Sequence, residues 1–273
     1  MHRDFRFGVG TWGAKSQDRF TDAAKRFEDF GFDVLNVADH LPAPAPFPIL
    51  AAAAQVTSTI KLGTYVLNAG FYKPALLGRD AAEVDLLSSG RLELGLGAGY
   101  VREEFEAAEL PYPSAGARVD HLEHVTAYFN EHHPSIPIMI AGNGDRVLTI
   151  AARRANTVGL TGSDVGKGVD DPLAERVAFV KDAAGERFDS LELNIAITAS
   201  PTDASGMPDL TLTRRYVGDM PEEQVLALPA VLSGTPRDIA DKLRGLRDTY
   251  GLTSFSVQHH HAEYFAKVIA ELR

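Results

Sequence analysis

The 273-residue sequence predicts an α/β protein, a (β/α)8 TIM barrel that forms one domain over residues 1–273. Three observations predict this fold. Eight short β-rich runs recur along the chain, a longer segment with helical spacing follows most of them, and no linker divides the chain. The length alone, at roughly 150 residues per domain, would also allow two domains. Single α/β barrels commonly reach about 250 residues, so the repeated pattern decides in favour of one barrel.

The first repeat unit shows the pattern most clearly. It comprises a strand, a helix and a second strand at residues 5–10, 18–30 and 34–38. Within the helix, Phe20, Ala24 and Phe27 recur at helical spacing and give one apolar face. Gly31 supplies the expected stop after the helix.

The other units follow in the same alternation. Further strands are expected at residues 60–67, 91–97, 136–141, 157–161, 191–199 and 253–257. Further helices are expected at residues 74–87, 118–129, 145–152, 171–184, 236–250 and 262–272. Residues 199–229 are rich in Pro, Asp, Thr and Gly, which predicts a long loop with a short helix inserted in the barrel. The insert could serve as a lid or a subunit contact, or it could be a loop without function.

The composition excludes several classes of function. Lys and Arg number 27 against 37 Asp and Glu, and the formal charge of −10 does not suit a partner that is a nucleic acid. The absence of Cys excludes disulfides, thiolate metal sites and cysteine nucleophiles. The charged N-terminal residues lack the apolar stretch of a signal peptide, and no apolar run approaches the roughly 20 residues of a membrane span. We therefore expect a cytoplasmic protein with no membrane partner.

In a barrel of this kind, the residues just after each strand build the active site. Asp39 and His40 follow the second strand, and Asn68 follows the third. A histidine at this place could exchange a proton with a bound ring near neutral pH, or it could be a structural residue of the rim. Asp39 could alternatively cap a short turn. Trp12, the only Trp, follows the first strand and could either wall a pocket or pack in the rim.

One glycine-rich segment is placed to bind phosphate. Gly142, Asn143 and Gly144 lie between the fifth strand and a helix, where backbone N–H groups and the helix dipole can hold an anion. Thr161 and Gly162, at the end of the next strand, could bring a hydroxyl and an amide to the same phosphate. The alternative for the first segment is an ordinary tight turn between strand and helix.

Three further patterns give weaker signals. Residues 95–99 resemble half of a dinucleotide fingerprint, but Arg102 stands where the third glycine would be. Residues 259–261 are all His, yet three neighbours in a strand do not converge on one metal ion. His121 and His124 lack the zincin spacing and are expected on a solvated helix face. We therefore predict no metal site.

Four segments together resemble the bacterial luciferase-like superfamily of flavin- and deazaflavin-dependent oxidoreductases. They are GFDVLNVADH at 31–40, KLGTYVL at 61–67, SGRLELGLGAGY at 89–100 and IMIAGNG at 138–144. The match covers essentially the whole chain in order. The closest resemblance is to the actinobacterial branch that depends on coenzyme F420, in which NGDRVL, here residues 143–148, followed by VGLTG, here residues 158–162, is characteristic.

The resemblance implies a luciferase-like barrel that binds an isoalloxazine or deazaflavin ring at its mouth. A cis peptide bond between Tyr65 and Val66 would back the ring, with His40 as the catalytic residue beside it. The cofactor-binding positions implied are Asp39, Tyr65, Val66, Asn68, Ala98, Gly99, Gly142, Asn143, Gly144, Thr161 and Gly162.

The sequence departs from the superfamily at two places. Tyr100 stands where the F420-dependent sugar-phosphate and alcohol dehydrogenases carry an acidic residue, which leaves Glu103, Glu104 or Tyr100 itself as substitutes. The segment between strands 4 and 5 is also shortened, because the fourth helix leads within a few residues to Ile136.

The function implied by the resemblance is hydride transfer between reduced coenzyme F420 and a small organic substrate. An FMN-dependent monooxygenase that uses reduced flavin and O2 is the alternative, and a non-catalytic flavin-binding barrel is the third possibility. Related barrels pair through the helices beside strands two and three, so a homodimer is expected as well. Residues 51–54, all Ala, would allow close packing there.

Overall fold

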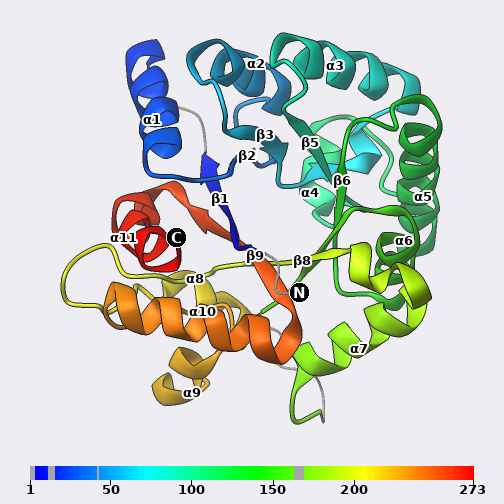
Figure 1. The fold of residues 1–273 in the computed structure, drawn as a ribbon. Helices are drawn as coiled ribbons and strands as arrows, with labels where there is room; N and C mark the ends of the chain where they lie inside the picture. Colours follow the sequence, from blue (N-terminus) through cyan, green and yellow to red (C-terminus); the bar gives the residue numbers. More distant parts are fainter. Residues whose placement is uncertain (1–3, 12–15, 42, 163–168) are drawn as a thin grey trace.

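The computed structural model describes residues 4–11, 16–41, 43–162 and 169–273. Its strands form one closed parallel sheet with helices packed around it, as Figure 1 shows. The strands are β1 (Arg6–Thr11), β2 (Val34–Val37), β3 (Lys61–Thr64), β4 (Leu67–Asn68), β5 (Leu92–Gly97), β6 (Ile138–Ala141), β7 (Thr157–Leu160), β8 (Glu192–Ala196) and β9 (Leu252–Gln258). Pairing of β3 with β5 closes the barrel, which confirms the predicted (β/α)8 fold.

The third strand of the barrel is broken into two short pieces. The peptide bond between Tyr65 and Val66 is cis, as the resemblance implied, and it separates β3 from β4. Both pieces pair with β5. Leu62 of β3 lies opposite Leu92 of β5, and Leu67 of β4 lies opposite Leu96 of β5. The prediction of one continuous strand over residues 60–67 is therefore wrong at this bond.

The helices of the barrel lie outside the sheet. They are α1 (Gln17–Asp29), α2 (Pro46–Val56), α3 (Pro74–Leu87), α4 (Arg102–Ala107), α5 (Ala115–His132), α6 (Asp145–Arg154), α7 (Pro172–Ala184), α10 (Pro236–Tyr250) and α11 (Ala262–Leu272). In α1, Phe20, Ala24 and Phe27 are buried as predicted, and the Ser16 side chain caps the first turn. The connection from α5 to β6 spans only residues 133–137, so the expected short segment is present.

Two short helices form the insert that was expected to hold one. They are α8 (Thr211–Val217) and α9 (Glu222–Ala227), and they surround a small apolar cluster of their own that includes Ala199, Val225 and Val231. The ammonium group of Lys242, in α10, donates to the backbone carbonyls of Leu226, Leu228 and Val231, and burial lowers its pKa to about 8. The insert is thereby fastened to the barrel at its second helix.

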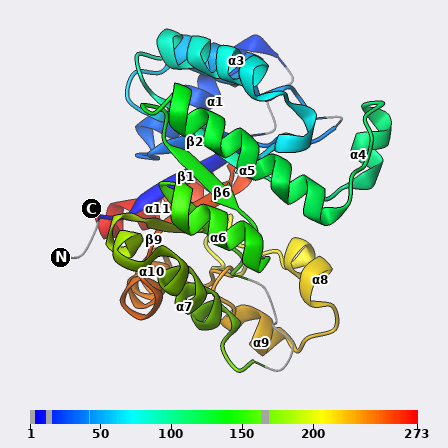
Figure 2. The same ribbon diagram turned by 90° about the vertical axis from the view of Figure 1, so that its right-hand side faces the viewer.

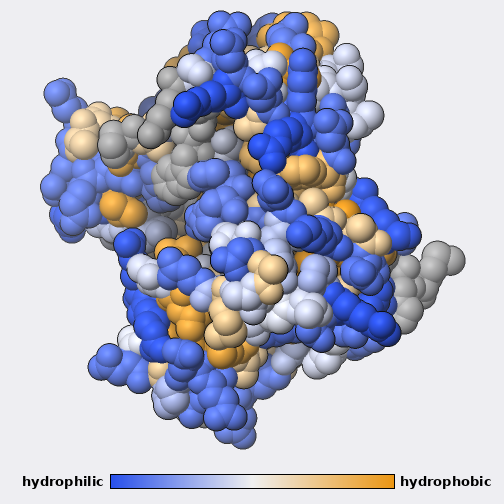
Figure 3. Space-filling view, turned by 90° about the vertical axis from the view of Figure 1, so that its left-hand side faces the viewer, coloured by the Kyte–Doolittle hydropathy of each residue, from blue (hydrophilic) through white to orange (hydrophobic). Residues whose placement is uncertain are grey.

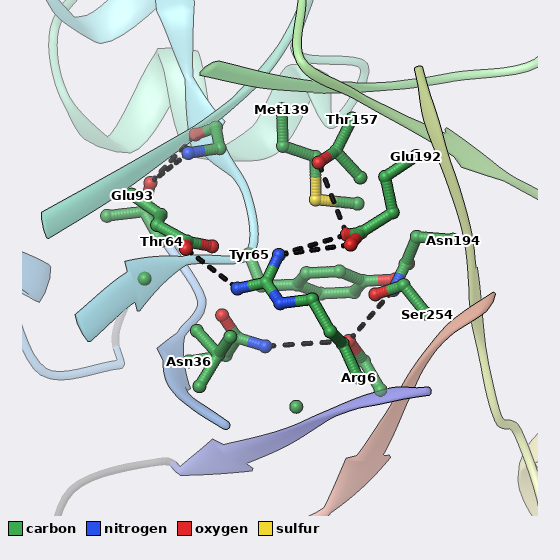
Figure 4. Close-up of a pocket in the computed structure, with 15 residues that line it drawn as sticks. Arg6, Asn36, Thr64, Tyr65, Glu93, Met139, Thr157, Glu192, Asn194 and Ser254 are labelled. Carbon is green, nitrogen blue, oxygen red and sulfur yellow. Dashed lines mark hydrogen bonds and ion pairs between the residues drawn. The ribbon is translucent and has the colours of Figure 1, made fainter. Parts of the chain in front are cut away.

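The interior of the barrel is polar at its amino end, as the close-up in Figure 4 shows. The Arg6 guanidinium pairs with Glu93 at 2.7 Å and with Glu192 at 3.1 Å, so two carboxylates share one cation. Deeper in the barrel, the Tyr65 hydroxyl donates to Asn194 Oδ1 at 2.7 Å, and the Asn194 amide donates to Ser254. These polar side chains leave a cavity of about 30 Å³. The Tyr65 ring lies across the barrel and separates this interior from the mouth.

The molecule presents a largely polar face on the side of α1 and α11 (Figure 3). The face in Figure 3 is mostly hydrophilic, and hydrophobic residues gather on it only in small patches. Within the described residues, no helix is both long enough and apolar enough to cross a membrane.

Candidate active site

The mouth of the barrel holds two adjoining cavities at the carboxyl ends of the strands. Figure 2 shows this end on the right, with α4 and α8 on opposite sides of it. The first cavity, of about 330 Å³, is bordered by the ends of β2 to β8 and by α4. Nine of the twelve predicted site residues line it, namely Asp39, His40, Tyr65, Val66, Asn68, Ala98, Gly99, Gly142 and Thr161. The structure thus brings these positions together, while their individual roles stay predictions.

Asp39 fastens the broken third strand against the wall of the first cavity. Its carboxylate accepts a hydrogen bond from the backbone N–H of Asn68 at 3.1 Å and is also bonded by the Tyr72 hydroxyl. Burial raises the pKa of Asp39 above its ordinary value. Gly99 packs directly on Asn68, since a Cβ there would lie 2.0 Å from the Asn68 side-chain oxygen and the φ angle is +72°. Glycine is required at this position.

His40 stands at the rim of the first cavity and is paired with a carboxylate. Its Nδ1 lies 2.7 Å from Oε1 of Glu104, a side chain in α4 that is only 12% exposed. An ionised carboxylate is an acceptor only, so in this contact Nδ1 is the donor and carries a proton. The sequence had offered Glu104 as a substitute acid. Its partnership with His40, 64 residues away, leaves no mark in the sequence pattern.

At its other end the first cavity reaches Gly142, in the turn that leads into α6. Gly144 precedes this helix, no side chain caps it, and a Cβ on Gly144 would meet no protein atom within 4 Å. The Arg176 guanidinium lies next to this turn, where it donates to the Asn143 carbonyl at 3.3 Å and pairs with Asp145 at 2.6 Å. Open backbone N–H groups at a helix N-terminus are suited to phosphate, so the donor set fits a phosphate-bearing cofactor.

Three predicted positions lie outside the lining of the first cavity: Asn143, Gly144 and Gly162. Asn143 and Gly144 lie beside Gly142, which does line it. Gly162 has a different environment, because a Cβ there would lie 3.0 Å from Ala230 and its carbonyl accepts from the Ala230 N–H at 3.1 Å. The structure therefore places Gly162 in contact with the segment that follows α9.

The second cavity, of about 210 Å³, lies over the other half of the mouth. Residues from β1, β2, β8, β9 and α8 border it, and it shares His40, Tyr65 and Ala196 with the first cavity. His40 and the Tyr65 ring therefore form the wall between the two spaces. Trp12, expected near this place, lies outside the described residues.

The two histidine-rich segments differ in structure from the expectation. Residues His259–His261 form a short 3-10 helix rather than a strand, so the expected alternation of their side chains is wrong. His121 is not on a solvated face, because its Nε2 hydrogen-bonds the backbone carbonyls of Ala69 and Tyr72 at 3.1 and 3.0 Å. In the described parts of the chain, no three His, Asp or Glu side chains are grouped so as to hold a metal ion.

Comparison with known proteins agrees with this geometry. Residues 5–127 match the model of the luciferase-like monooxygenase family. An F420-dependent glucose-6-phosphate dehydrogenase from Nocardia farcinica is 31% identical over 216 residues, which cover 66% of this chain and 63% of the relative. The first curated relatives are matched over about a third to just under two thirds of their own length.

Solved structures extend the likeness to the whole fold. The coenzyme F420-dependent tetrahydromethanopterin reductase from Methanopyrus kandleri superposes with a TM-score of 0.77 at 19% identity, over 99% of this chain and 100% of the reductase chain. An F420-dependent secondary alcohol dehydrogenase gives a TM-score of 0.78 at 14% identity, over 99% and 100%. The resemblance to the luciferase-like superfamily is thereby confirmed, in sequence over the first half of the chain and in fold throughout. The similar proteins are F420-dependent oxidoreductases and luciferase-like monooxygenases.

Proposed function

We propose that this protein is an oxidoreductase that binds coenzyme F420 in the first cavity and transfers hydride to or from a small organic substrate. The observation that carries the proposal is a single cavity with the His40–Glu104 pair at one end and Gly142 at the other. Gly142 begins the turn that leads to the uncapped N-terminus of α6. The F420-dependent relatives favour this cofactor.

Different residues would bind the ring and the phosphate of the cofactor. Val66, Ala98 and Gly99 would form the surface that receives the ring, and Asp39 would hold that surface in place through Asn68. The turn of Gly142, Asn143 and Gly144, with Thr161 beside it, would receive the phosphate. These residues fit a ring joined to a phosphate, as in F420 and FMN alike.

His40 and Glu104 would provide the proton chemistry. When bound, F420 supplies or accepts a hydride, which leaves a proton to be delivered to or taken from the other reactant. The imidazole of His40 can hold that proton at its second ring nitrogen, while the carboxylate of Glu104 accepts from Nδ1 and orients the ring. Glu104 then acts through His40, which gives the chain an acid where Tyr100 replaces the usual acidic residue.

An FMN-dependent monooxygenase is the second candidate. It is favoured by the family model over residues 5–127 and by solved monooxygenases of the same fold, such as the one from Streptomyces bottropensis with a TM-score of 0.75. The phosphate turn and the ring surface would serve FMN in the same way. A cytoplasmic location, a single domain over residues 1–273 and a small-molecule substrate are parts of the same proposal.

The experiment that tests the proposal is a parallel fluorescence titration of the purified protein with F420 and with FMN. The proposal predicts saturable binding of F420 that is tighter than the binding of FMN. Tighter binding of FMN would replace the leading function by the monooxygenase. Binding of neither would favour a barrel without a redox role.

A further inference from the structure

Two tyrosine side chains stand unusually exposed at the mouth of the barrel. Tyr100 follows β5 and is 75% exposed, and Tyr216 lies in α8 and is 60% exposed. Tyr100 lines the first cavity, and Tyr216 lines the second. The two phenols come from opposite sides of the mouth, and their mutual electrostatic effect contributes to the raised pKa of Tyr100, after burial. Exposed aromatic surface at the rim of a cavity is typical of a place that a ligand covers.

The lining of the second cavity is neutral and partly apolar. Leu212, Ile197 and Val257 supply its apolar part. Its polar part consists of hydroxyl groups and side-chain amides, together with the His40 imidazole, and these groups belong to Thr11, Thr198, Ser256, Asn36 and Gln258. Groups of this kind can hydrogen-bond a carbonyl or a hydroxyl, and they suit an uncharged ligand.

The helix that carries Tyr216 is held firmly over this cavity. The hydroxyls of Thr198 and Thr213 are hydrogen-bonded at 2.8 Å, which ties α8 to the segment after β8. Arg214 donates to the Met220 carbonyl at 3.0 Å and so joins α8 to the turn before α9. Tyr216 therefore has a fixed support, although its ring is exposed.

We propose that the second cavity is the substrate subsite, and that it takes a small uncharged molecule with a planar, unsaturated part. The planar part stacks against Tyr216, and the carbonyl or hydroxyl oxygen of the molecule faces His40, since both side chains line this cavity. The inference rests on the proposed function, since it takes the first cavity as the cofactor site. It makes Tyr216 a specificity-determining residue that nothing in the sequence patterns had indicated.

The test uses three probes that differ in one property each. Acetophenone is planar and uncharged, cyclohexyl methyl ketone lacks the planar ring, and phenyl phosphate carries a charge. Their binding to the full chain is measured by saturation-transfer NMR, with and without F420. We expect acetophenone to bind at least about tenfold more tightly than the other two, because stacking on an aromatic ring adds to simple burial.

Variants assign the binding to Tyr216. Tyr216→Ala should weaken the binding of acetophenone about tenfold, whereas Tyr216→Phe keeps the aromatic ring and should bind acetophenone as tightly as the wild type does. Met207→Ala is the matched control, since Met207 is an exposed side chain of the same insert that lines neither cavity. Thermal melting of each variant reports whether the insert stays folded.

The outcomes separate this inference from the proposed function. Equal binding of the saturated ketone, tighter binding of phenyl phosphate to the F420-saturated protein, or unchanged affinity in Tyr216→Ala would overturn the inference. The comparison of the two ketones and the result for Tyr216→Ala do not depend on F420, because these are also measured on the protein alone. Failure of the F420 titration with normal acetophenone binding would instead count against the proposed function.

Discussion

The imidazole of His261 lies 3% exposed just after β9, in the 3-10 helix that ends the last strand. Its ring hydrogen-bonds the backbone of Ser200 and Pro201, while its Nδ1 has no hydrogen-bond partner among the described residues. Burial disfavours the charged form, and the neighbouring histidines add to this effect, so the pKa of His261 falls to about 4 from an ordinary value of 6.5. His261 is therefore a neutral, structural residue.

This burial predicts an acid-sensitive contribution to stability. Between pH 6.5 and 4, His261 is protonated in the unfolded chain but neutral in the folded chain. The free energy of unfolding is therefore highest above pH 6.5 and decreases as the pH falls toward 4. The shift corresponds to about 3 kcal/mol at most. Replacement by phenylalanine, which does not titrate, should flatten the free energy of unfolding over this window. Urea denaturation of the wild type and His261→Phe at pH 4.5 and 7 measures the difference, and parallel pH profiles would contradict it.

At the scale of elements, the turn at the start of α6 is the proposed phosphate site. Its first turn has no side-chain cap, and Gly144 faces open space. Gly142 is less free, since a Cβ there would lie 2.9 Å from Val147 of the same helix. A side chain at position 144 would therefore obstruct the proposed phosphate without disturbing the protein, whereas one at position 142 would also press on Val147 of α6.

We predict that Gly144→Val lowers cofactor affinity by at least about tenfold while the melting temperature changes little, because several N–H contacts to the phosphate are lost. Gly245→Val is the matched control, since Gly245 lies in α10 and a Cβ there also meets nothing within 4 Å. Fluorescence titration and thermal melting on both variants provide the comparison. Equal cofactor affinity in the two variants would contradict the assignment of the phosphate site to this turn.

At the scale of the whole molecule, α3 presents apolar side chains to solvent. Leu86 is 73% exposed, and Leu76 and Leu87 on the same helix are also exposed. Helix α3 packs beside α2 on the upper side of the barrel in Figure 1, and α2 carries the alanine run of residues 51–54. Three exposed leucines on one helix indicate a surface that contacts another protein chain.

We predict that the protein is a homodimer through this surface. The double change Leu86→Glu with Leu87→Glu should yield a monomer, because it places charges where apolar side chains would meet. Light scattering at micromolar concentration measures the mass of both forms, and Met207→Glu, which alters an exposed side chain elsewhere, is the control. A monomeric wild type would refute the prediction.

The sequence predicted the barrel because its strands and most of its helices have a clear period. It missed α2, since an almost wholly apolar run such as residues 46–56 has no polar side to reveal a helix. It also ran β3 and β4 together, because the bond between Tyr65 and Val66 leaves no mark in the periodicity. The resemblance supplied that bond.

The site was predictable only where its residues follow strands directly. Asp39, His40 and Asn68 were found in this way, and all three line the first cavity. The pairing of Glu104 with His40 could not be predicted in this way, because Glu104 lies in the short helix α4 and does not directly follow a strand. The polar interior around Arg6 escaped sequence reasoning for a similar reason, since its two carboxylates come from β5 and β8.

The central claim is that His40 performs the proton chemistry at a cofactor held mainly from the other end of the cavity. The single-turnover rate of His40→Ala, saturated with reduced F420 and mixed with acetophenone, tests it most directly. We predict a rate at least about a hundredfold below the wild type, with F420 affinity and melting temperature nearly unchanged. A normal single-turnover rate in the folded, cofactor-saturated variant would contradict this role of His40.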